Sequence, residues 1–179
     1  MYYTMGYDSP VGRLLLAERD GALTGLWMEG QKYYCGSQQG ERMEKADTEV
    51  LHQAGVWLDR YFKGEKPSAG ELPLAPEGSA FRREVWKLLC EIPYGEVTTY
   101  GEISKKIAAD RGISNMSAQA VGGAVGHNPI SIIIPCHRVV GTNGSLTGYA
   151  GGLEKKIKLL ALEGVDMDKL FVPARGTAL

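Results

Sequence analysis

Cysteine is scarce in this sequence. The 179 residues include 3 cysteines, Cys35, Cys90 and Cys136, an odd number without any Cys-X-X-Cys pair. Disulfide-stabilised secreted proteins and cysteine-rich zinc proteins need more cysteines at closer spacing. The sequence therefore predicts neither a disulfide scaffold nor a cysteine-rich zinc site, and each cysteine is expected to be a free thiol.

Long hydrophobic runs are also missing. The longest apolar stretches, such as 132–134 and 159–162, are far too short to span a bilayer. The first four residues, Met-Tyr-Tyr-Thr, do not begin a basic-then-apolar signal peptide. We therefore expect a cytoplasmic protein that does not insert into a membrane.

Neither sign of charge is in excess over the whole chain, but charge is unevenly distributed. A formal net charge of -1 is untypical of a general binder of polyanions. Residues 1–79 carry 8 Lys and Arg against 12 Asp and Glu, whereas residues 80–179 carry 12 against 9. The C-terminal part is therefore the better candidate for binding an anionic partner. Hydrophobic residues make up 44%, which is typical of a folded globular protein.

The N-terminal part is expected to form a small antiparallel sheet covered by a helix. Turn residues at 9–12 and at Asp20-Gly21 separate short apolar runs, and Asp-Gly is typical of a two-residue hairpin turn. Apolar residues then recur at three- and four-residue steps from Val50 to Phe62. The segment 66–78 is rich in proline and glycine and predicts a linker. We therefore expect domains at 1–78, with the linker starting near 64, and at 79–179.

Helices dominate the expected C-terminal domain. Ser79 can cap one helix, and Thr99 with Glu102 has capping-box spacing at the start of another. Ser117 can cap a third helix over 118–125, which is rich in alanine and glycine. Two short helices joined by a turn are typical of a helix-turn-helix whose second helix approaches a partner closely. Tight packing inside the domain explains the small residues equally well.

A nucleophile, a base and a cation are consecutive at Cys136-His137-Arg138. They follow the apolar run 130–134, which predicts a short buried strand. A thiol with a pKa of about 8.5 becomes a useful nucleophile when a neighbouring base or positive charge favours the thiolate. The alternative is a buried structural cysteine beside a hydrogen-bonded histidine, which is the commoner role of such a dipeptide.

A carboxylate that could complete this group ends the next predicted helix, Leu153 to Glu163. The helix dipole disfavours a carboxylate in the last turn, so Glu163 breaks a local rule. Such a residue often has a partner, and a carboxylate that orients His137 would complete a Cys-His-acid arrangement. The alternative is a solvated surface glutamate.

The run Ile134-Pro135-Cys136-His137-Arg138-Val139-Val140 resembles the active-site motif of the O6-alkylguanine-DNA alkyltransferases, also called methylated-DNA-protein-cysteine methyltransferases. The resemblance continues in order through most of the C-terminal domain, at Phe81–Trp86, Pro93–Tyr100, Ala120–Ala124, Asn128–Pro129, Gly148–Leu153 and Leu162–Gly164. It is weaker in the N-terminal half, where it covers Ser9–Gly12 and the hairpin that follows. The resemblance implies an α/β protein with a ribonuclease-H-like N-terminal domain and a winged-helix-like C-terminal domain.

Members of this family bind damaged duplex DNA in the minor groove, flip the alkylated guanine out of the helix, and transfer its O6-alkyl group to their own cysteine. The resemblance thus implies Cys136 as the acceptor, with His137, through a water, and Glu163 removing its proton. O4-methylthymine is a further candidate lesion. The product is a thioether, so each molecule is expected to act once. The resemblance also implies a monomer that needs no cofactor.

The resemblance also implies roles for the surrounding residues. Asn128 supports the proton network, and Tyr100 donates a proton toward guanine N3. The flipped base is expected to contact Val139, Tyr149, Ala150, Gly151 and Lys156. DNA contacts are expected from Thr99, Ser117, Ala118, Gln119, Ala120, Gly122, Gly123 and Arg138.

The sequence departs from the family pattern in the recognition helix. Gln119 stands where family members usually have an arginine that enters the base stack, so we expect weaker or more salt-tolerant DNA binding. Ala150 replaces a small hydroxyl residue. Cys35 and His52 have no companions that would complete a zinc site of the kind found in some relatives, so zinc is not predicted.

Three other functions compete with this interpretation. An alkyltransferase-like lesion sensor lacks the acceptor cysteine, which Cys136 supplies here. A cysteine hydrolase is disfavoured because its cysteine and histidine normally come from distant segments. A transcriptional regulator is disfavoured because no dimerisation segment is evident.

Overall fold

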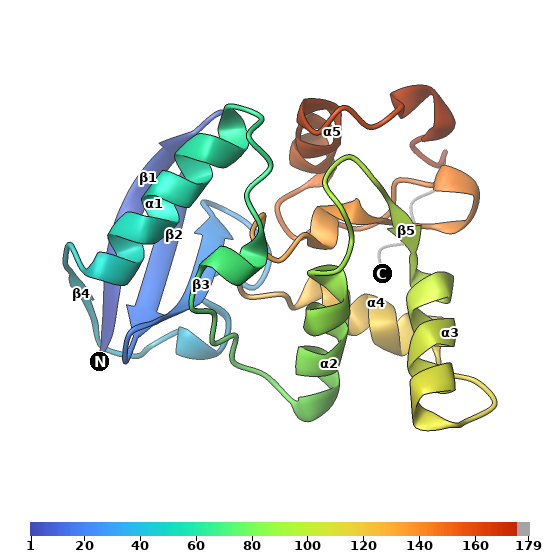
Figure 1. Cartoon of the computed structure of the whole chain (residues 1–179), viewed down its shortest axis with the longest axis horizontal. Helices are drawn as coiled ribbons and strands as arrows, with labels where there is room; N and C mark the ends of the chain where they lie inside the picture. The colour runs from blue at the N-terminus through green and yellow to red at the C-terminus, as the bar shows by residue number, and fades with distance from the viewer. Residues whose placement is uncertain (175–179) are drawn as a thin grey trace.

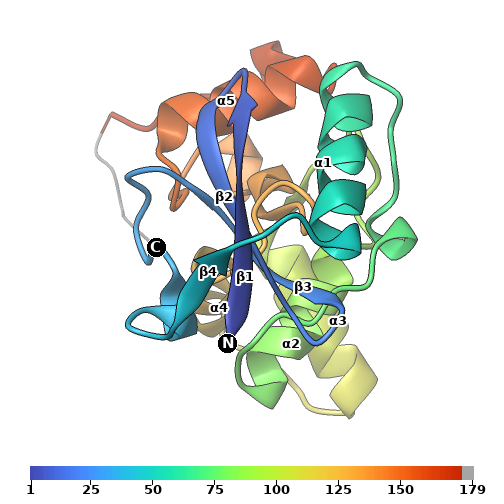
Figure 2. The same cartoon turned by 90° about the vertical axis from the view of Figure 1, so that its left-hand side faces the viewer.

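The N-terminal part is a four-stranded sheet with one helix packed on it. The structure, a computed structural model, describes residues 1–174. Strands β1 (Tyr2–Ser9), β2 (Gly12–Arg19) and β3 (Ala22–Met28) are antiparallel neighbours, and β4 (Met43–Lys45) pairs with β1 in parallel. Helix α1 (Glu49–Phe62) lies along one face of the sheet (Figure 1), and Figure 2 shows it beside β1 and β2.

Local sequence explains most of these elements. Asp20 and Gly21 have positive φ values of 55° and 80°, as the tight turn between β2 and β3 requires. Thr48 caps α1 by accepting a hydrogen bond from the Leu51 amide at 3.3 Å. The predicted hairpin and helix are therefore confirmed, whereas the short parallel strand β4 was not predicted.

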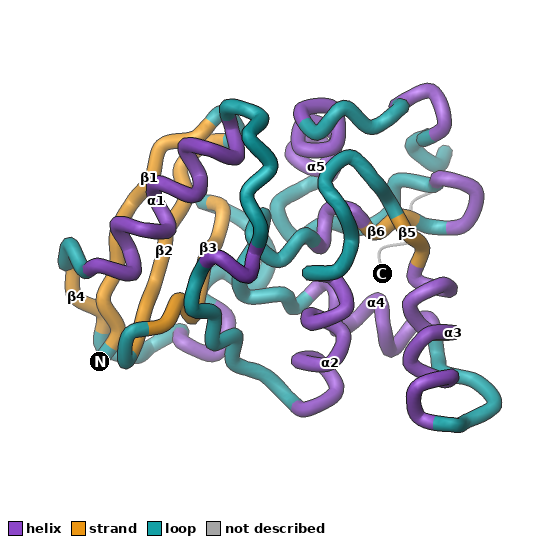
Figure 3. Tube along the Cα trace, viewed as in Figure 1, coloured by secondary structure: helices purple, strands orange, loops and turns teal. Residues whose placement is uncertain are grey.

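The C-terminal part is mainly helical. Its helices are α2 (Ala80–Leu89), α3 (Tyr100–Arg111), α4 (Ala118–Gly126) and α5 (Leu153–Leu162), and the two-residue strands β5 (Thr98–Thr99) and β6 (Val139–Val140) pair in parallel (Figure 3). Single 3-10 turns occupy Gly36–Gln38, Ala69–Glu71, Cys136–Arg138, Thr142–Gly144 and Met167–Lys169. Within the described range, each helix is too short or too polar to cross a bilayer.

The predicted caps of these helices are all present. Ser79 accepts a hydrogen bond from the Arg82 amide at 3.2 Å, and Ser117 accepts one from the Ala120 amide at 3.1 Å. Thr99 forms a complete capping box with Glu102 at the start of α3. These side chains satisfy amide groups that the first turn of a helix leaves unpaired, and they set where each helix begins.

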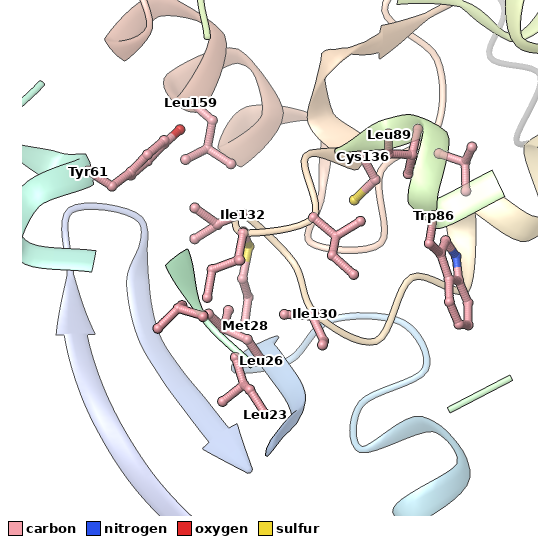
Figure 4. Packing of buried hydrophobic residues seen from close by; sticks show 14 of the residues in the cluster. Leu23, Leu26, Met28, Tyr61, Trp86, Leu89, Ile130, Ile132, Cys136 and Leu159 are labelled. Carbon is pink, nitrogen blue, oxygen red and sulfur yellow. The ribbon is translucent and has the colours of Figure 1, made fainter. Parts of the chain in front are cut away.

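The two parts share one hydrophobic core. Leu26 of β3 bonds through its amide to the Pro129 carbonyl and through its carbonyl to the Ser131 amide, and Leu23 pairs with Leu74 of the linker. Leu23 and Leu26 belong to one buried cluster with Cys136, and Figure 4 shows Cys136 between the side chains around β3 and Ile132 and those of Leu89 and Trp86. Cys136, the candidate nucleophile, is therefore part of a hydrophobic core to which both parts of the chain contribute.

The segment 130–134 differs from the expected strand. Only Ile130 pairs with a strand, in an isolated bridge to Leu26, and residues 131–134 form a turn in which Ile132 has a φ of 71°. The Asn128 side chain explains the turn, because it bonds to the Ile130 amide and to the Ile134 carbonyl. The prediction of a strand was wrong because periodicity reports burial, and this turn is as buried as a strand would be.

Candidate active site

Cys136 begins a buried 3-10 turn shortly after the turn at residues 130–134, which the Asn128 side chain holds. Asn128 Nδ2 donates to the Ile134 carbonyl at 2.8 Å, and Asn128 Oδ1 accepts from the Ile130 amide at 3.0 Å. Cys136 is 6% exposed and His137 is fully buried. Asn128 thus holds the chain that presents the thiol, as a residue with both a donor and an acceptor group can do.

Glu163 is the hub of the site, at the C-terminal end of α5. Its Oε1 accepts from His137 Nε2 at 2.6 Å, from Arg138 Nη2 at 2.9 Å and from the Tyr61 hydroxyl at 2.7 Å. Its Oε2 accepts from Arg138 Nε at 2.9 Å and from the Gly95 amide at 3.4 Å. These donors compensate for the unfavourable position of a carboxylate at a helix C-terminus.

The protonation states of His137 and Glu163 follow from this geometry. Burial acts to raise the pKa of Glu163, but hydrogen bonds from His137 and Arg138 outweigh it and lower the pKa to about 2. Burial lowers the pKa of His137 despite the neighbouring carboxylate. The carboxylate can only accept, so Nε2 carries the imidazole proton. Nδ1 then has a free lone pair, and it is buried without a partner among the described residues.

Cys136 is a thiol at rest. Burial raises its pKa, while the Asn128 amide and the charge of Lys156 act in the opposite direction. A protonated, buried thiol needs a base at the moment of reaction, and the neutral imidazole of His137 is the nearest residue in sequence that can serve. The site therefore combines a nucleophile, a base and an anion that orients the base.

Lys156 is fully buried rather than solvated. Its Nζ donates to the Val139 carbonyl at 2.6 Å and to the Thr147 carbonyl at 2.9 Å. Burial lowers its pKa to about 8, and a thiolate at Cys136 would oppose this shift. On the same helix, Leu159 and Leu160 are fully buried, while Leu153 and Ile157 are half-buried and pack against the cluster that contains Leu160.

A small pocket of about 120 Å³ has Tyr100 and Tyr149 in its walls. Its lining residues come from both parts of the chain and are Lys32, Tyr33, Tyr100, Gly122, Gly126, Gly148, Tyr149 and Ala150. Burial raises the pKa of Tyr100 to about 12, so its hydroxyl remains a donor at neutral pH. Burial is the main cause that raises the pKa values of Tyr100 and Tyr149, and a thiolate at Cys136 would raise both further, so the sulfur lies within electrostatic range of these pocket walls.

A second, larger hollow of about 460 Å³ opens next to this pocket, and Tyr100 lines both. It is lined by Thr99, Tyr100, Gly101, Ala118, Gln119, Gly141, Thr142, Ser145 and Thr147. The N-termini of α3 and α4 therefore meet the segment 141–147 in front of the site. The dipole of α4 favours an anion at its N-terminus, where the first turn has no acidic residue, and this suits the opening to a phosphate backbone, whereas the Glu102 carboxylate already occupies the N-terminus of α3.

The outer face of α4 is bare. Ala118, Gln119, Ala120 and Gly123 are exposed, and a Cβ added at Gly123 would meet no other atom within 4 Å. Tight packing inside the domain therefore does not explain the small residues on this face. They leave it open to close approach by a partner, which is the other explanation that the sequence offered.

Most residues expected at the site lie together, and Arg138 is the clearest exception. Cys136, His137, Glu163, Asn128 and Lys156 form one buried group, while Tyr100, Tyr149 and Ala150 line the adjoining pocket. Arg138 was expected at the DNA, but it is 8% exposed and also donates through Nη1 to the Ile92 carbonyl at 2.7 Å. We therefore assign its guanidinium to Glu163 and not to DNA.

Sequence reasoning missed three residues of the N-terminal part. Lys32 and Tyr33 line the pocket, and the Lys32 amide bonds to the Ala150 carbonyl at 2.9 Å. The cluster of exposed aromatic residues after β3 is the signal that could have indicated them. Tyr61 occupies an ordinary apolar position of α1, so nothing in the sequence distinguished its hydroxyl. Within residues 1–174, no three or more His, Cys, Asp or Glu side chains are grouped to hold a metal ion.

Comparison with known proteins identifies both parts of the chain. Residues 1–76 match the ribonuclease-like domain of 6-O-methylguanine DNA methyltransferase, and residues 80–165 match its DNA-binding domain. A methylated-DNA--protein-cysteine methyltransferase of Haemophilus influenzae is 43% identical over 165 residues, which cover 92% of this chain and 87% of that protein. One of Methanosarcina acetivorans is 44% identical over 169 residues, covering 92% and 99%.

Solved structures agree with this relationship. The crystal structure of Mycobacterium tuberculosis O6-methylguanine methyltransferase has a TM-score of 0.75 and 40% identity, covering 98% of this chain and 97% of that one. The same organism's OGT in complex with DNA has a TM-score of 0.75 and 42% identity, covering 97% and 95%. On this evidence the chain belongs to the 6-O-methylguanine DNA methyltransferase family.

Proposed function

We propose that the protein repairs DNA by transferring the O6-alkyl group of a damaged guanine to the sulfur of Cys136. The observation that carries this proposal is the buried Cys136-His137-Glu163 group, in which Glu163 Oε1 accepts from His137 Nε2 at 2.6 Å and so orients the imidazole. The pocket nearby is lined by Tyr100, whose hydroxyl can donate a proton. The family relationship supports the same reaction. A hydrolase would need a water that attacks an acyl intermediate, whereas alkyl transfer needs only a thiolate and a leaving group.

The reaction balances with residues of this chain. His137 Nδ1 takes the thiol proton through a water, and the thiolate attacks the alkyl carbon. The S–C bond forms, the C–O6 bond breaks, and its electron pair stays on the guanine oxygen. Tyr100 donates a proton to guanine N3, which improves the leaving group, and the proton held by His137 replaces it. The net result is a thioether on Cys136 and an unmodified guanine.

Access to the alkylated base requires that it leave the duplex. The bare face of α4 suits close approach to the minor groove, and the hollow in front of Tyr100 leads to the pocket that Tyr100 and Tyr149 line. Flipping costs on the order of a few kcal/mol, and less where alkylation has already weakened pairing. Contacts with the flipped base would come from Tyr149, Ala150 and Gly151.

The proposal includes single use of each molecule, because no base in this site can break a thioether. Residues 79–179 would carry the chemistry and residues 1–78 would support it. That the protein acts as a monomer in the cytoplasm, and that O4-methylthymine is also a substrate, remain predictions from the sequence.

The decisive experiment is intact-protein mass spectrometry after mixing with duplex DNA that contains O6-methylguanine. We expect one methyl group per molecule, mapped to Cys136 by peptide analysis and absent from Cys136→Ala. Cys90→Ala is the matched control because Cys90 is an exposed free thiol. If the wild-type protein bound the lesion but gained no methyl group, it would be a lesion sensor and the transferase assignment would fall.

A further inference from the structure

We propose that Tyr61, in the N-terminal part of the chain, is a positioning residue for Glu163 and His137. Its hydroxyl donates to Glu163 Oε1 at 2.7 Å, the same oxygen that accepts from His137 Nε2 at 2.6 Å. This inference rests on the proposed function and gives the N-terminal part a share in the chemistry. Among the described residues the Tyr61 hydroxyl bonds to Glu163 and not to Cys136 or His137, so it would act through the carboxylate.

Tyr61 differs from the other donors to Glu163 in where it comes from. Arg138 and His137 belong to the same turn as the thiol, and Gly95 belongs to the loop before β5. Among the hydrogen bonds of the described residues, only the one from Tyr61 reaches Glu163 from residues 1–79, across a separation of 102 residues. The orientation of the carboxylate therefore depends on how α1 docks against the C-terminal part.

The ring of Tyr61 is held firmly enough to position another group. It is fully buried, it stacks on Trp57 with ring centres 5.5 Å apart, and it meets the edge of Phe62 at 5.1 Å. Tyr94 of the C-terminal part packs against it at 5.9 Å. Figure 4 shows the hydroxyl end of Tyr61 directed toward α5. Aromatic contacts from both parts thus fix the ring and the position of the hydroxyl oxygen.

The hydroxyl is a permanent neutral donor. Burial, followed by the charge of Glu163, raises the pKa of Tyr61 far above its usual value, so it never competes for the proton. Donation to Oε1 stabilises the negative charge there and reduces the pull of Glu163 on the proton of His137. Tyr61 would therefore keep His137 neutral and ready to accept the proton of Cys136.

Other charged groups face the pair as well, and the test must leave them unchanged. Arg138 and Lys156 lower the pKa of His137. The charge of Lys156 also acts on Cys136, the charges of Glu163 and Arg138 act on Tyr94, and the charge of Glu163 acts on Tyr149. Tyr61→Phe removes one oxygen and keeps the ring, so these groups stay in place. We expect the pKa of His137 to rise by about one unit in this variant, because the carboxylate then attracts the proton more strongly.

Histidine NMR measures this shift without any DNA. The chain has 3 histidines, so 15N-labelled histidine gives few signals, and His52→Asn and His127→Asn variants assign them. In parallel, single-turnover methyl transfer is measured against pH. The acidic limb of the rate profile should move to higher pH in Tyr61→Phe, with a rate about ten-fold lower on that limb and an unchanged rate on the plateau above it, since a higher pKa leaves less neutral His137.

Tyr7→Phe is the matched control. Tyr7 also donates to a carboxylate, Asp59 Oδ1 at 2.6 Å, but that pair is exposed and lies on the N-terminal sheet and α1. We expect it to leave the His137 titration and the rate profile unchanged. In the Glu163→Gln background, Tyr61→Phe should have no further effect on His137, because the anion that couples the two residues is gone.

A second substitution covers the case in which Tyr61→Phe does not fold. A 3-fluorotyrosine at position 61 keeps the ring and the hydroxyl but donates more strongly, so the pKa of His137 should fall instead of rise. If neither substitution moves the His137 titration, Tyr61 has a merely structural role and the proposal is overturned. Because NMR needs no substrate, this outcome is distinguishable from failure of the transferase assignment.

Discussion

His137 donates through Nε2 to Glu163 Oε1 at 2.6 Å, and neither side chain is exposed. This contact makes the pair a base with a defined free nitrogen, and it depends on a charged Glu163. The donors around Glu163 stabilise its charged form in the folded protein. The pair therefore contributes to the free energy of unfolding, and this contribution changes with pH.

Glu163→Gln should destabilise the protein in a pH-dependent way. The pKa of Glu163 is lowered from 4.5 to about 2 in the folded protein, so its stabilising contribution is fully present above 4.5 and is lost as pH falls toward 2. We expect the variant to be less stable by about 3 kcal/mol at pH 7, with a smaller difference at pH 3. Urea unfolding at several pH values measures this, with exposed Glu65→Gln as control. A difference that does not change with pH would contradict the prediction.

Asn128→Ala should loosen the segment before the thiol. The substitution removes the bonds to the Ile134 carbonyl and the Ile130 amide, and it leaves these buried groups unpaired. We expect a loss of about 2 kcal/mol in unfolding free energy together with slower methyl transfer. Exposed Asn115→Ala should change neither quantity. A variant with full stability and full rate would show that the turn holds without this side chain.

Lys156 should produce an alkaline limit to activity. Its pKa is about 8, so above this pH it loses the positive charge that favours the thiolate of Cys136. We expect the rate of transfer to decline above about pH 8, and Lys156→Met to be slow at every pH without that decline. Lys158→Met, at an exposed position of the same helix, should keep the wild-type profile. The prediction fails if Lys156→Met retains the decline.

Gln119→Arg should strengthen DNA binding. Gln119 is exposed on the bare face of α4 and lines the hollow that leads to Tyr100, so an arginine there adds charge beside the DNA path. We expect tighter binding and a salt dependence that is steeper by about one phosphate contact. Fluorescence anisotropy at several salt concentrations measures both. Gln53→Arg adds the same charge on α1, and equal gains from both variants would exclude a local role for position 119.

Residues close to one another in sequence were the most predictable. The Asp20-Gly21 turn, the caps Ser79, Thr99 and Ser117, and the order of the helices all follow from interactions within a few residues. Such local interactions depend little on the rest of the fold. The strand expected at 130–134 was wrong because the Asn128 side chain, and not the apolar pattern, decides the backbone there.

Hydrogen-bond partners at long range were not predictable. From the sequence, Arg138 is expected to contact DNA, and Tyr61 is expected only to pack on the apolar face of its helix. Both bond to Glu163 because α1, the turn at Cys136 and the end of α5 meet in one buried place. In the same way, the sequence placed Lys156 at the flipped base but gave no sign that its ammonium group bonds to the carbonyls of Val139 and Thr147.

The sequence by itself determined the family and the local elements, and it predicted Cys136, His137 and Glu163 as the reactive residues, since a Cys-His pair and a glutamate at a helix C-terminus are visible without coordinates. Only the tertiary structure decided which oxygen each donor reaches, that Lys156 is buried, and that the N-terminal part contributes to both the pocket and the carboxylate. The physical reason is that charge and hydrogen bonding depend on burial and on contacts between distant segments, which no local pattern encodes.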